Sequence, residues 1–292
     1  MAPTRAILAT AANRAGTPWR AAHVPGHHDS GHRDPSQRDP SQRETALAVR
    51  CSLLAPPGTT ALQPRGKMMT LSIPQDARIR VVGDVHGDAS AFAYASATDR
   101  FVLQLGDLTD HGPDSAGTLR IMFRLIDQQR GLFLLGNHDL KLARTLAGQQ
   151  MRPDPLVQAT IEQLDDGLRE RVLLETERAP AWLRHGDALF VHGGFHTDML
   201  DQPSPEHGLD RPHGAVARAL YGEPTGRTQP DGYPERSLRW VDRIPAGVTV
   251  YCGHDQRSSD GRPYVRRGVA GGRAIFLDTG AGKGGHLSWI DL

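Results

Sequence analysis

Cysteine is scarce in this 292-residue chain, which contains only Cys51 and Cys252. Two cysteines so far apart and in such different contexts exclude a disulfide framework, so we expect a reducing, cytoplasmic location. The chain also lacks any run of about 18 apolar residues, which excludes a membrane-spanning segment. An excess of one charge sign is missing too: the formal net charge is +1, which argues neither for nor against a nucleic-acid partner.

Hydrophobic periodicity is missing from the first 67 residues. Residues 33–37 and 38–42 repeat the pentad Arg-Asp-Pro-Ser-Gln, with Pro, Gly and His scattered around it. Such a segment buries too little apolar surface to offset its ordering entropy, so we expect a disordered, low-complexity tail over residues 1–67. Its four histidines are irregularly spaced, which favours a solvated tail over a metal-binding tract.

Two alternatives remain for this tail. Its first 28 residues contain three arginines and no acidic residue, a composition shared with organelle transit peptides. A translation start at Met68 or Met69 would instead leave the tail out of the protein.

Short hydrophobic runs recur after Ser72 and indicate a folded domain over residues 68–292. Each run is continuously apolar, which is typical of strands covered on both faces. Residues 119, 122, 123 and 126 are apolar at helical spacing, with Asp114 or Ser115 as a possible cap, and residues 156–168 predict a second helix. Alternating strands and helices predict a layered α/β domain. The predicted strands are 78–82, 101–105, 132–135, 188–191, 248–252 and 274–277.

Polar side chains follow five of these strands, each beside a glycine. In open α/β sheets, ligands gather at the carboxyl ends of strands, and glycine allows a sharp turn and a close approach. A single Asp-Gly or His-Gly is more often a turn than a ligand site, but five repeats of one arrangement favour a site. The segments are Gly83–Gly87 (GDVHG), Gly106–Gly112 (GDLTDHG), Gly136–Asp139 (GNHD), His192–Gly194 (HGG) and Gly253–His254 (GH).

These segments supply a mixed set of oxygen and nitrogen donors: Asp84, His86, Asp107, Asn137, His192 and His254. Carboxylate and imidazole without thiolate suit Mn²⁺, Fe or Zn²⁺. Two ions about 3.5–4 Å apart need a bridging carboxylate, and Asp107 is the predicted bridge. Water activated between such ions loses its proton near neutral pH. We therefore predict a centre that holds two divalent ions and activates water as a nucleophile.

In this order the five segments resemble those of the calcineurin-like metallophosphoesterases, the group that includes the protein Ser/Thr phosphatases. The resemblance spans residues 78–292. It implies a layered α/β/β/α sandwich with a dinuclear metal site at strand ends. Three further stretches resemble the phosphatase domain of bacterial polynucleotide kinase-phosphatases and the bis(5′-nucleosyl)-tetraphosphatases: Gly136–Gly148, Leu220–Trp240 and Phe276–Leu287. It also implies a phosphoesterase with two divalent ions, Mn²⁺ foremost, and we expect no membrane and no obligate partner. The implied phosphoester substrate is a phosphoprotein, a nucleotide polyphosphate or a nucleic-acid end phosphate.

The resemblance also implies individual roles. The first ion would be held by Asp84, His86 and Asp107, and the second by Asp107, Asn137, His192 and His254. His138 would protonate the leaving oxygen while Asp110 orients its imidazole, a role that suits histidine near pH 7. Arg236 lies where the family places a phosphate clamp, and Arg239 and Arg243 are rivals for that role.

Position 111 departs from the family, whose second motif ends Asp-Arg-Gly and uses that arginine to hold the substrate phosphate. An imidazole offers fewer donors than a guanidinium, so His111 is expected to hold phosphate less strongly, to favour slightly acid pH or to fit another substrate. This departure favours an alternative function, a catalytically weak protein of the same fold that binds metal and a nucleotide. The complete donor set and His138 favour the enzyme.

Two other motifs resemble known functional sites but lack features that those sites need. Residues 277–281 (LDTGA) match the active-site string of aspartic proteases, but too few residues follow them to build a flap and pocket. The glycine-rich stretch Gly280–Gly285 lacks the spacing and the Ser or Thr of a P-loop.

Overall fold

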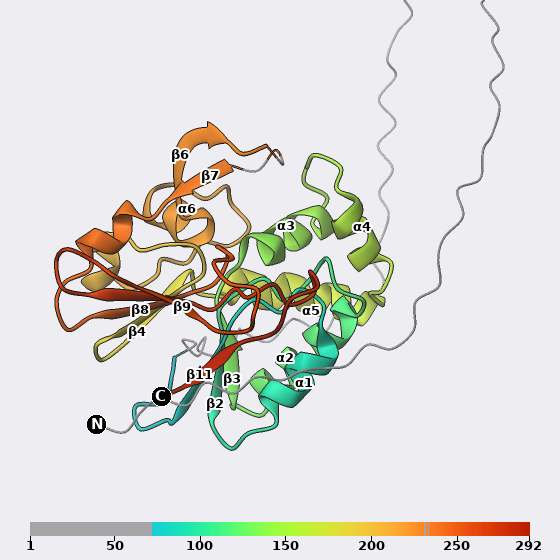
Figure 1. The fold of residues 1–292 in the computed structure, drawn as a ribbon. Coiled ribbons are helices and arrows are strands. Elements are labelled where there is room, and N and C mark those ends of the chain that lie inside the picture. The colour runs from blue at the N-terminus through green and yellow to red at the C-terminus, as the bar shows by residue number, and fades with distance from the viewer. Residues whose placement is uncertain (1–71, 231, 233) are drawn as a thin grey trace, which may run out of the picture. The chain divides into compact units, whose positions relative to one another are not determined.

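The computed structural model describes residues 72–230, 232 and 234–292, and the tail predicted over residues 1–67 lies outside them. The described residues form two main β-sheets and a separate two-stranded hairpin, with helices packed beside the sheets (Figure 1). None of the helices in this part of the chain is long and apolar enough to span a membrane.

The first sheet has the strand order β11-β1-β2-β3. Its strands are β1 (Ile79–Val82), β2 (Phe101–Gln104), β3 (Gly131–Phe133) and β11 (Trp289–Asp291). The three strands from β1 to β3 are parallel, and β11 pairs antiparallel with β1. The parallel strands therefore end at the same edge of the sheet, where their carboxyl ends lead into the predicted site segments.

The second sheet repeats this arrangement in the order β4-β5-β8-β10-β9. Its strands are β4 (Trp182–His185), β5 (Ala188–Val191), β8 (Thr249–Cys252), β9 (Tyr264–Arg267) and β10 (Arg273–Phe276). The inner strands β5, β8 and β10 are parallel, and the two edge strands are antiparallel to their neighbours. All six predicted strands are thus present, and each sheet has a core of three parallel strands.

A hydrophobic layer joins the two sheets. Ile79 and Leu103 of the first sheet belong to the same buried cluster as Phe190, Tyr251 and Ile275 of the second. Neighbouring residues in the same strands belong to a second cluster, which also contains the buried faces of the helices. Because both faces of the parallel strands are covered, their sequences are continuously apolar. The predicted α/β sandwich is confirmed.

The helices are α1 (Ala89–Ser96), α2 (Ser115–Asp127), α3 (Asn137–Leu146), α4 (Pro155–Ile161), α5 (Asp166–Arg178) and α6 (Gly214–Tyr221), with 3₁₀ turns η1 (Thr197–Leu200) and η2 (Arg239–Arg243). Helix α2 is the one predicted from its apolar spacing. Its N-cap is Asp114, whose carboxylate accepts a hydrogen bond of 2.7 Å from the Gly117 amide. Helix α3 begins at Asn137, so the segment Gly136–Asp139 leads into its first turn.

The helix predicted over residues 156–168 is wrong as a single element. The structure instead has α4, which ends at Ile161, and α5, which begins at Asp166. The break follows from a cap within the predicted helix, because the Asp165 carboxylate accepts a 2.8 Å hydrogen bond from the Leu168 amide. Short polar side chains favour such caps over helix interiors.

The edge strands β4, β9 and β11 and the hairpin of β6 (Glu223–Thr228) and β7 (Pro234–Ser237) were not predicted. They are short or largely exposed, and β9 has the sequence YVRR. One-sided burial leaves no continuous apolar run from which such strands could be predicted.

Candidate metal centre

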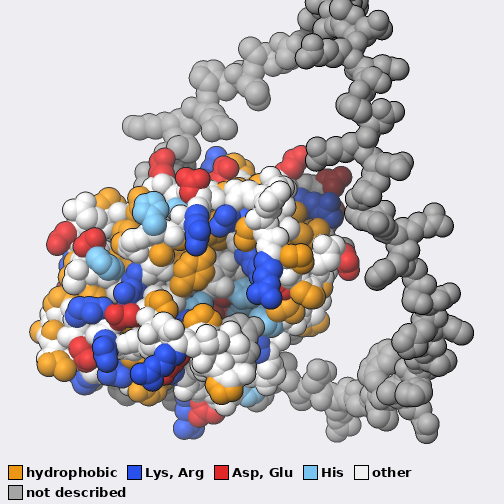
Figure 2. Space-filling model, turned by 90° about the horizontal axis from the view of Figure 1, so that it is seen from above, with side chains coloured by type: hydrophobic (Ala, Val, Ile, Leu, Met, Phe, Trp, Pro, Cys, Tyr) orange, Lys and Arg blue, Asp and Glu red, His pale blue; other side chains and the backbone are white. Residues whose placement is uncertain are grey.

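The carboxyl ends of the parallel strands from both sheets bring the predicted ligands together. Viewed toward this end of the molecule, histidine side chains lie in a hollow with Lys and Arg side chains around it (Figure 2). Three groups of side chains there have donor atoms within 4.8 Å of one another. They are Asp84, His86 and Asp278; Asp107, His192 and His254; and His86, His111 and His138.

Asp107 lies between the two predicted ion positions. Its Oδ2 is 3.7 Å from His86 Nε2 and 3.3 Å from His192 Nε2. Its Oδ1 accepts a 2.9 Å hydrogen bond from the backbone amide of His138. The Asn137 Oδ1 lies 3.1 Å from the same His192 nitrogen. One carboxylate thus faces donors from both halves of the site.

The histidine rings are oriented by backbone carbonyl groups. Nδ1 of His86 donates to the Thr109 carbonyl at 3.0 Å, and Nδ1 of His192 donates to the Leu105 carbonyl at 2.9 Å. A carbonyl can only accept, so each Nδ1 carries a proton and each Nε2 faces the other donors. The Nε2 atoms of His86 and His254 are buried without a hydrogen-bond partner among the described residues. Buried polar atoms are rarely left unpaired, and this orientation is the one found in histidines that bind metals.

The segment Gly253–His254 fixes the position of Asp84. Both of its carboxylate oxygens lie 3.0 Å from the backbone amide of His254. A Cβ atom on Gly253 would lie 2.0 Å from Asp84 Oδ1, so only glycine permits this approach. This steric requirement explains why a glycine, Gly253, precedes His254 in the sequence.

The charges of the centre are poorly balanced without a cation. Burial, and next the neighbouring Asp278, raise the pKa of Asp84 well above its usual value. Burial lowers the pKa of His86 and of His254 well below theirs. Burial also opposes charge on His192, but Asp107 raises the pKa of His192 to about 9. Divalent ions would offset the clustered carboxylates and occupy the unpaired imidazole nitrogens, so the donor set fits the metals that were predicted.

Backbone strain is concentrated at this centre. Six non-glycine residues in the described part of the chain have positive φ angles. Five of them are site residues: His86 (46°), Asp107 (61°), Asp110 (72°), His111 (62°) and His254 (62°). Positive φ is uncommon for residues with a side chain and gathers at functional sites. The motif loops are therefore held in conformations that local sequence does not favour.

His138 and Asp110 form the predicted pair. His138 Nδ1 lies 2.6 Å from Asp110 Oδ2, and the other Asp110 oxygen accepts a 2.6 Å hydrogen bond from the Thr160 hydroxyl of α4. Burial opposes charge on His138, but Asp107 and Asp110 outweigh it and raise its pKa. The pair is therefore arranged to keep a proton on this imidazole.

His111 lies beside these residues. Its ring centroid is 4.9 Å from that of His86 and 5.4 Å from that of His138. Burial lowers its pKa, and the charges of Lys283 and His138 lower it further. Asp255, which follows the segment Gly253–His254, is paired with Arg257 at 2.5 Å.

The three predicted arginines differ in their surroundings. Arg236 donates to the Tyr221 carbonyl at 3.3 Å, and its charge contributes to lowering the pKa of His254, after burial and His192. Arg243 is paired with Glu223 at 3.2 Å, and the Arg239 side chain is exposed. Of the three, the structure brings Arg236 toward the donor cluster.

Sequence reasoning missed two buried carboxylates. Both oxygens of Asp139 accept backbone hydrogen bonds, one from the Asp107 amide at 2.8 Å and one from the Leu108 amide at 3.0 Å. These bonds hold the segment Gly106–Gly112 against the segment Gly136–Asp139. Burial and Asp107 raise its pKa to about 6. Asp278 directly follows Leu277 at the end of the predicted strand 274–277, and Gly280 is two residues on. This is the strand-end pattern of the other motifs, and the resemblance to a protease string concealed it.

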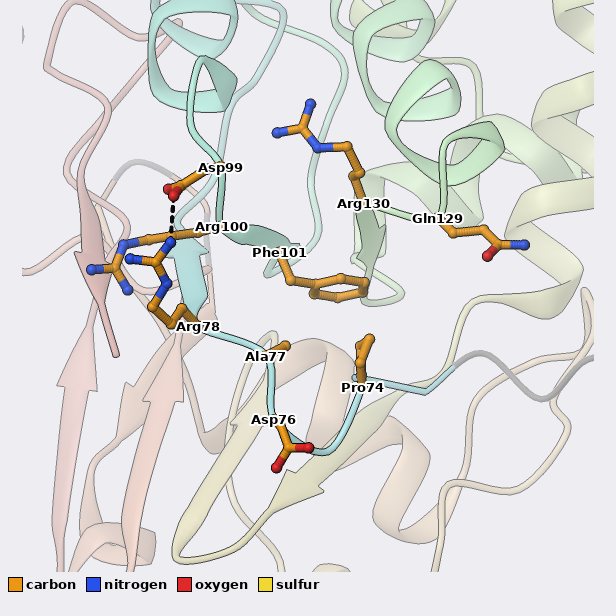
Figure 3. A pocket seen from close by; sticks show the side chains of 9 residues that line it. All are labelled: Pro74, Asp76, Ala77, Arg78, Asp99, Arg100, Phe101, Gln129 and Arg130. Carbon is orange, nitrogen blue, oxygen red and sulfur yellow. Dashed lines mark hydrogen bonds and ion pairs between the residues drawn. The ribbon is translucent and has the colours of Figure 1, made fainter.

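A pocket of about 240 Å³ lies at the other end of the first sheet. Figure 3 shows its lining, with Phe101 facing into it and Arg78 paired with Asp99 at its rim. These residues precede or begin β1 and β2, whereas ligands of α/β sheets gather at the carboxyl ends. The pocket is therefore separate from the candidate centre.

The fold and the donor set are those of a phosphoric ester hydrolase that uses divalent metal ions. Residues 77–258 match the family described as calcineurin-like phosphoesterase. The chain belongs to this family, and the predicted resemblance is confirmed.

Individual relatives are more distant. A protein named bis(5′-nucleosyl)-tetraphosphatase PrpE [asymmetrical], from Geobacillus sp. (strain WCH70), is 26% identical over 72% of this chain and 89% of its own length. A symmetrical bis(5′-nucleosyl)-tetraphosphatase from Chromohalobacter salexigens is 33% identical over 56% of this chain and 60% of its own. A protein serine/threonine phosphatase structure from Saccharomyces cerevisiae has a TM-score of 0.51 and 16% identity, and covers 72% of this chain and 71% of its own. The last likeness shows the fold alone.

Proposed function

We propose that this protein hydrolyses a phosphoric ester or anhydride with water activated between two divalent metal ions, Mn²⁺ foremost, with Fe or Zn²⁺ as alternatives. The observation that supports this most is the convergence of six donor side chains in which Asp107 faces both halves of the site. Bound ions would supply an activated water and neutralise phosphate charge. Asp84, His86 and Asp107 would hold the first ion, and Asp107, Asn137, His192 and His254 the second.

His138 is the general acid in this proposal. A leaving alkoxide or phosphate needs a proton as its bond to phosphorus breaks. The 2.6 Å contact with Asp110 fixes the ring at Nδ1 and leaves Nε2 to face the substrate. The hydrogen bond from Thr160 fixes Asp110 in turn, so the acid is oriented by a chain of contacts rather than by a single one.

Among the predicted substrates, we favour a nucleotide polyphosphate. The names of relatives that match most of this chain support this choice. Arg236 of β7 brings positive charge toward the centre, which suits a substrate with several phosphate groups. We also propose a cytoplasmic location, which the scarcity of cysteine supports.

The test is a hydrolysis panel with Mn²⁺ containing diadenosine tetraphosphate, p-nitrophenyl phosphate, a 2′,3′-cyclic nucleotide and a phosphopeptide. We expect the highest kcat/KM for diadenosine tetraphosphate. Asp107→Asn should abolish turnover of every substrate and lower the metal content, because both ions lose their shared ligand. Asp166→Asn, at a side chain that is 98% exposed, is the matched control and should retain full activity.

Two outcomes would contradict the proposal in different ways. If the phosphopeptide were the best substrate, the nucleotide assignment would be wrong and the hydrolase assignment would stand. If no substrate were turned over while two ions remained bound, the chain would be the catalytically weak binding protein suggested by His111.

A further inference from the structure

Position 111 is a histidine where the family has an arginine, and the cationic side chain of Lys283 lies near it. We infer that Lys283 binds the substrate phosphate in place of that arginine. The inference rests on the proposed hydrolase function and adds a substrate-binding residue to it. The predicted phosphate-binding residues do not include it, because the glycine-rich stretch around it fails the P-loop pattern.

Lysine is rare in this chain. Of 34 Lys and Arg residues, only Lys67, Lys141 and Lys283 are lysines. Lys67 lies outside the described residues, and Lys141 of α3 is paired with Asp154. A lysine ammonium is a compact point charge on a flexible stem, whereas a guanidinium needs room for its planar fork. A lysine is therefore suited to a crowded centre in which histidine occupies position 111.

The loop that carries Lys283 packs closely against the segment Gly83–Gly87. A Cβ atom on Gly282 would lie 2.1 Å from the His86 carbonyl oxygen, and Gly282 has a φ of +70°. The amides of Lys283 and Gly285 both donate to the Gly280 carbonyl, at 3.0 and 2.8 Å. The Thr279 hydroxyl donates to the His286 carbonyl at 2.5 Å and closes the loop. The backbone of Lys283 is therefore placed next to a candidate metal ligand.

Asp278 directs the side chain of Lys283 toward the centre. The Lys283 Nζ lies 3.8 Å from Asp278 Oδ2, an atom that is buried and has no hydrogen-bond partner among the described residues. The Asp278 side chain is fully buried, whereas that of Lys283 is 29% exposed. The ammonium therefore lies between the buried carboxylate and the open side of the site, where it can reach an incoming anion.

Lys283 lies close to side chains of the candidate centre. Asp278, which faces the Lys283 ammonium at 3.8 Å, has donor atoms within 4.8 Å of those of Asp84 and His86. The rings of His86, His111 and His138 meet edge to edge or tilted, with centroids 4.9–5.4 Å apart. Lys283 thus adds a permanent positive charge beside this cluster of three imidazoles.

A different role for Lys283 would be to neutralise Asp278 and support the fold. That role predicts a loss of stability and of metal binding when the lysine is removed. Phosphate binding predicts a loss of affinity for substrate and for inorganic phosphate, with metal content and stability close to wild type. Measurements of phosphate binding, metal content and melting temperature therefore separate the two roles.

The first experiment compares wild type, Lys283→Ala, Lys283→Arg and the matched control Lys141→Ala, all loaded with Mn²⁺. We expect Lys283→Ala to raise KM and the inhibition constant of inorganic phosphate by about tenfold to a hundredfold, as for loss of a hydrogen bond to a charged group. The fall in kcat should be smaller, because the ions and His138 remain. Lys283→Arg should keep most of the affinity, and Lys141→Ala should match wild type.

A double variant tests the replacement directly. In the Lys283→Ala background, His111→Arg should restore phosphate affinity, because it returns the guanidinium of the family to its position. Unchanged phosphate affinity in Lys283→Ala would overturn the inference, as would a parallel loss of metal and thermal stability. If wild type neither hydrolysed the panel nor bound phosphate, the proposed function itself would fail, which is a distinguishable result.

A second experiment uses the lysine variants only to assign NMR signals. Reductive methylation with ¹³C-formaldehyde labels the three lysines and the amino terminus, so the NMR spectrum contains few signals. Inorganic phosphate added to the Mg²⁺-loaded protein, which avoids paramagnetic broadening, should shift the Lys283 signal and leave those of Lys67 and Lys141 in place. A Lys283 signal that does not move at saturating phosphate would overturn the inference.

Discussion

His138 depends on its neighbours for both orientation and charge. Its backbone amide donates to Asp107 Oδ1, and its ring contacts Asp110, which in turn accepts from Thr160. The residue therefore connects the segment Gly106–Gly112, through Asp107 and Asp110, with α4. A change at this side chain should affect proton transfer without removing a metal donor.

We expect His138→Ala to retain two metal ions while kcat falls by about 10²–10⁴ for an ester with a poor leaving group, the usual contribution of a general acid. The loss should be much smaller for p-nitrophenyl phosphate, because its leaving group needs little protonation. The measurement is kcat for both esters, together with metal content. An equal loss on the two esters would rule out the general-acid role.

At the scale of elements, β11 is attached to β1 by side chains as well as by backbone pairing. Arg80 donates two hydrogen bonds to Asp291, at 2.7 and 2.8 Å, and Arg100 lies 3.3 Å from the same carboxylate. The side chains of Arg80 and Asp291 are 12% and 26% exposed. The hydrogen bond from Arg80 is the main cause that lowers the pKa of Asp291, and burial opposes it.

We expect Asp291→Asn to lower the free energy of unfolding by about 1–2 kcal/mol at pH 7. A lowered carboxyl pKa stabilises the fold above the unfolded value of about 3.9, and this contribution is lost as pH falls through the lower folded value. The difference between the two proteins should therefore shrink below about pH 4. Urea denaturation from pH 7 to pH 3 measures it.

The control for this comparison is Asp99→Asn. Asp99 also pairs with an arginine, Arg78, but the two side chains are 73% and 65% exposed. Exposed ion pairs contribute little, so this variant should unfold at nearly the wild-type urea concentration at every pH. An Asp291→Asn effect no larger than that of Asp99→Asn would show that the partly buried pair adds nothing.

At the scale of the whole molecule, the centre exists because two sheets present the carboxyl ends of their parallel strands to one site. Asp84 and Asp107 follow strands of the first sheet, whereas His192 and His254 follow strands of the second. The hydrophobic layer between the sheets sets the distance between these two pairs. All predicted metal ligands, and both hydrophobic clusters of the described residues, lie after residue 72.

Removing residues 1–67 should therefore leave kcat/KM unchanged and alter the free energy of unfolding by no more than about 0.5 kcal/mol, the usual range for changes away from a core. The comparison is between the full chain and a protein that begins at Met68, by thermal unfolding and by the hydrolysis panel. A marked loss of stability or activity would show that this segment contributes to the domain.

Much of the centre could be predicted because its chemistry is local. Each motif places a donor within a few residues of a strand end, and β-branched and aromatic residues reveal the buried strands themselves. The donor segments and six strands were therefore evident without structure. The break between α4 and α5 was missed because a cap at Asp165 competes with helical spacing, and the exposed edge strands have no continuous apolar pattern.

The amino-acid sequence by itself thus determined the donor types, their order and the family. Only the tertiary structure decided which residues from distant segments meet. Asp139 supports Asp107 across 32 positions, and Asp278 and Lys283 reach Asp84 and His86 from almost 200 residues away. Such contacts depend on how the two sheets pack and on backbone conformations with positive φ at the motif loops, and neither follows from the spacing of residues along the chain.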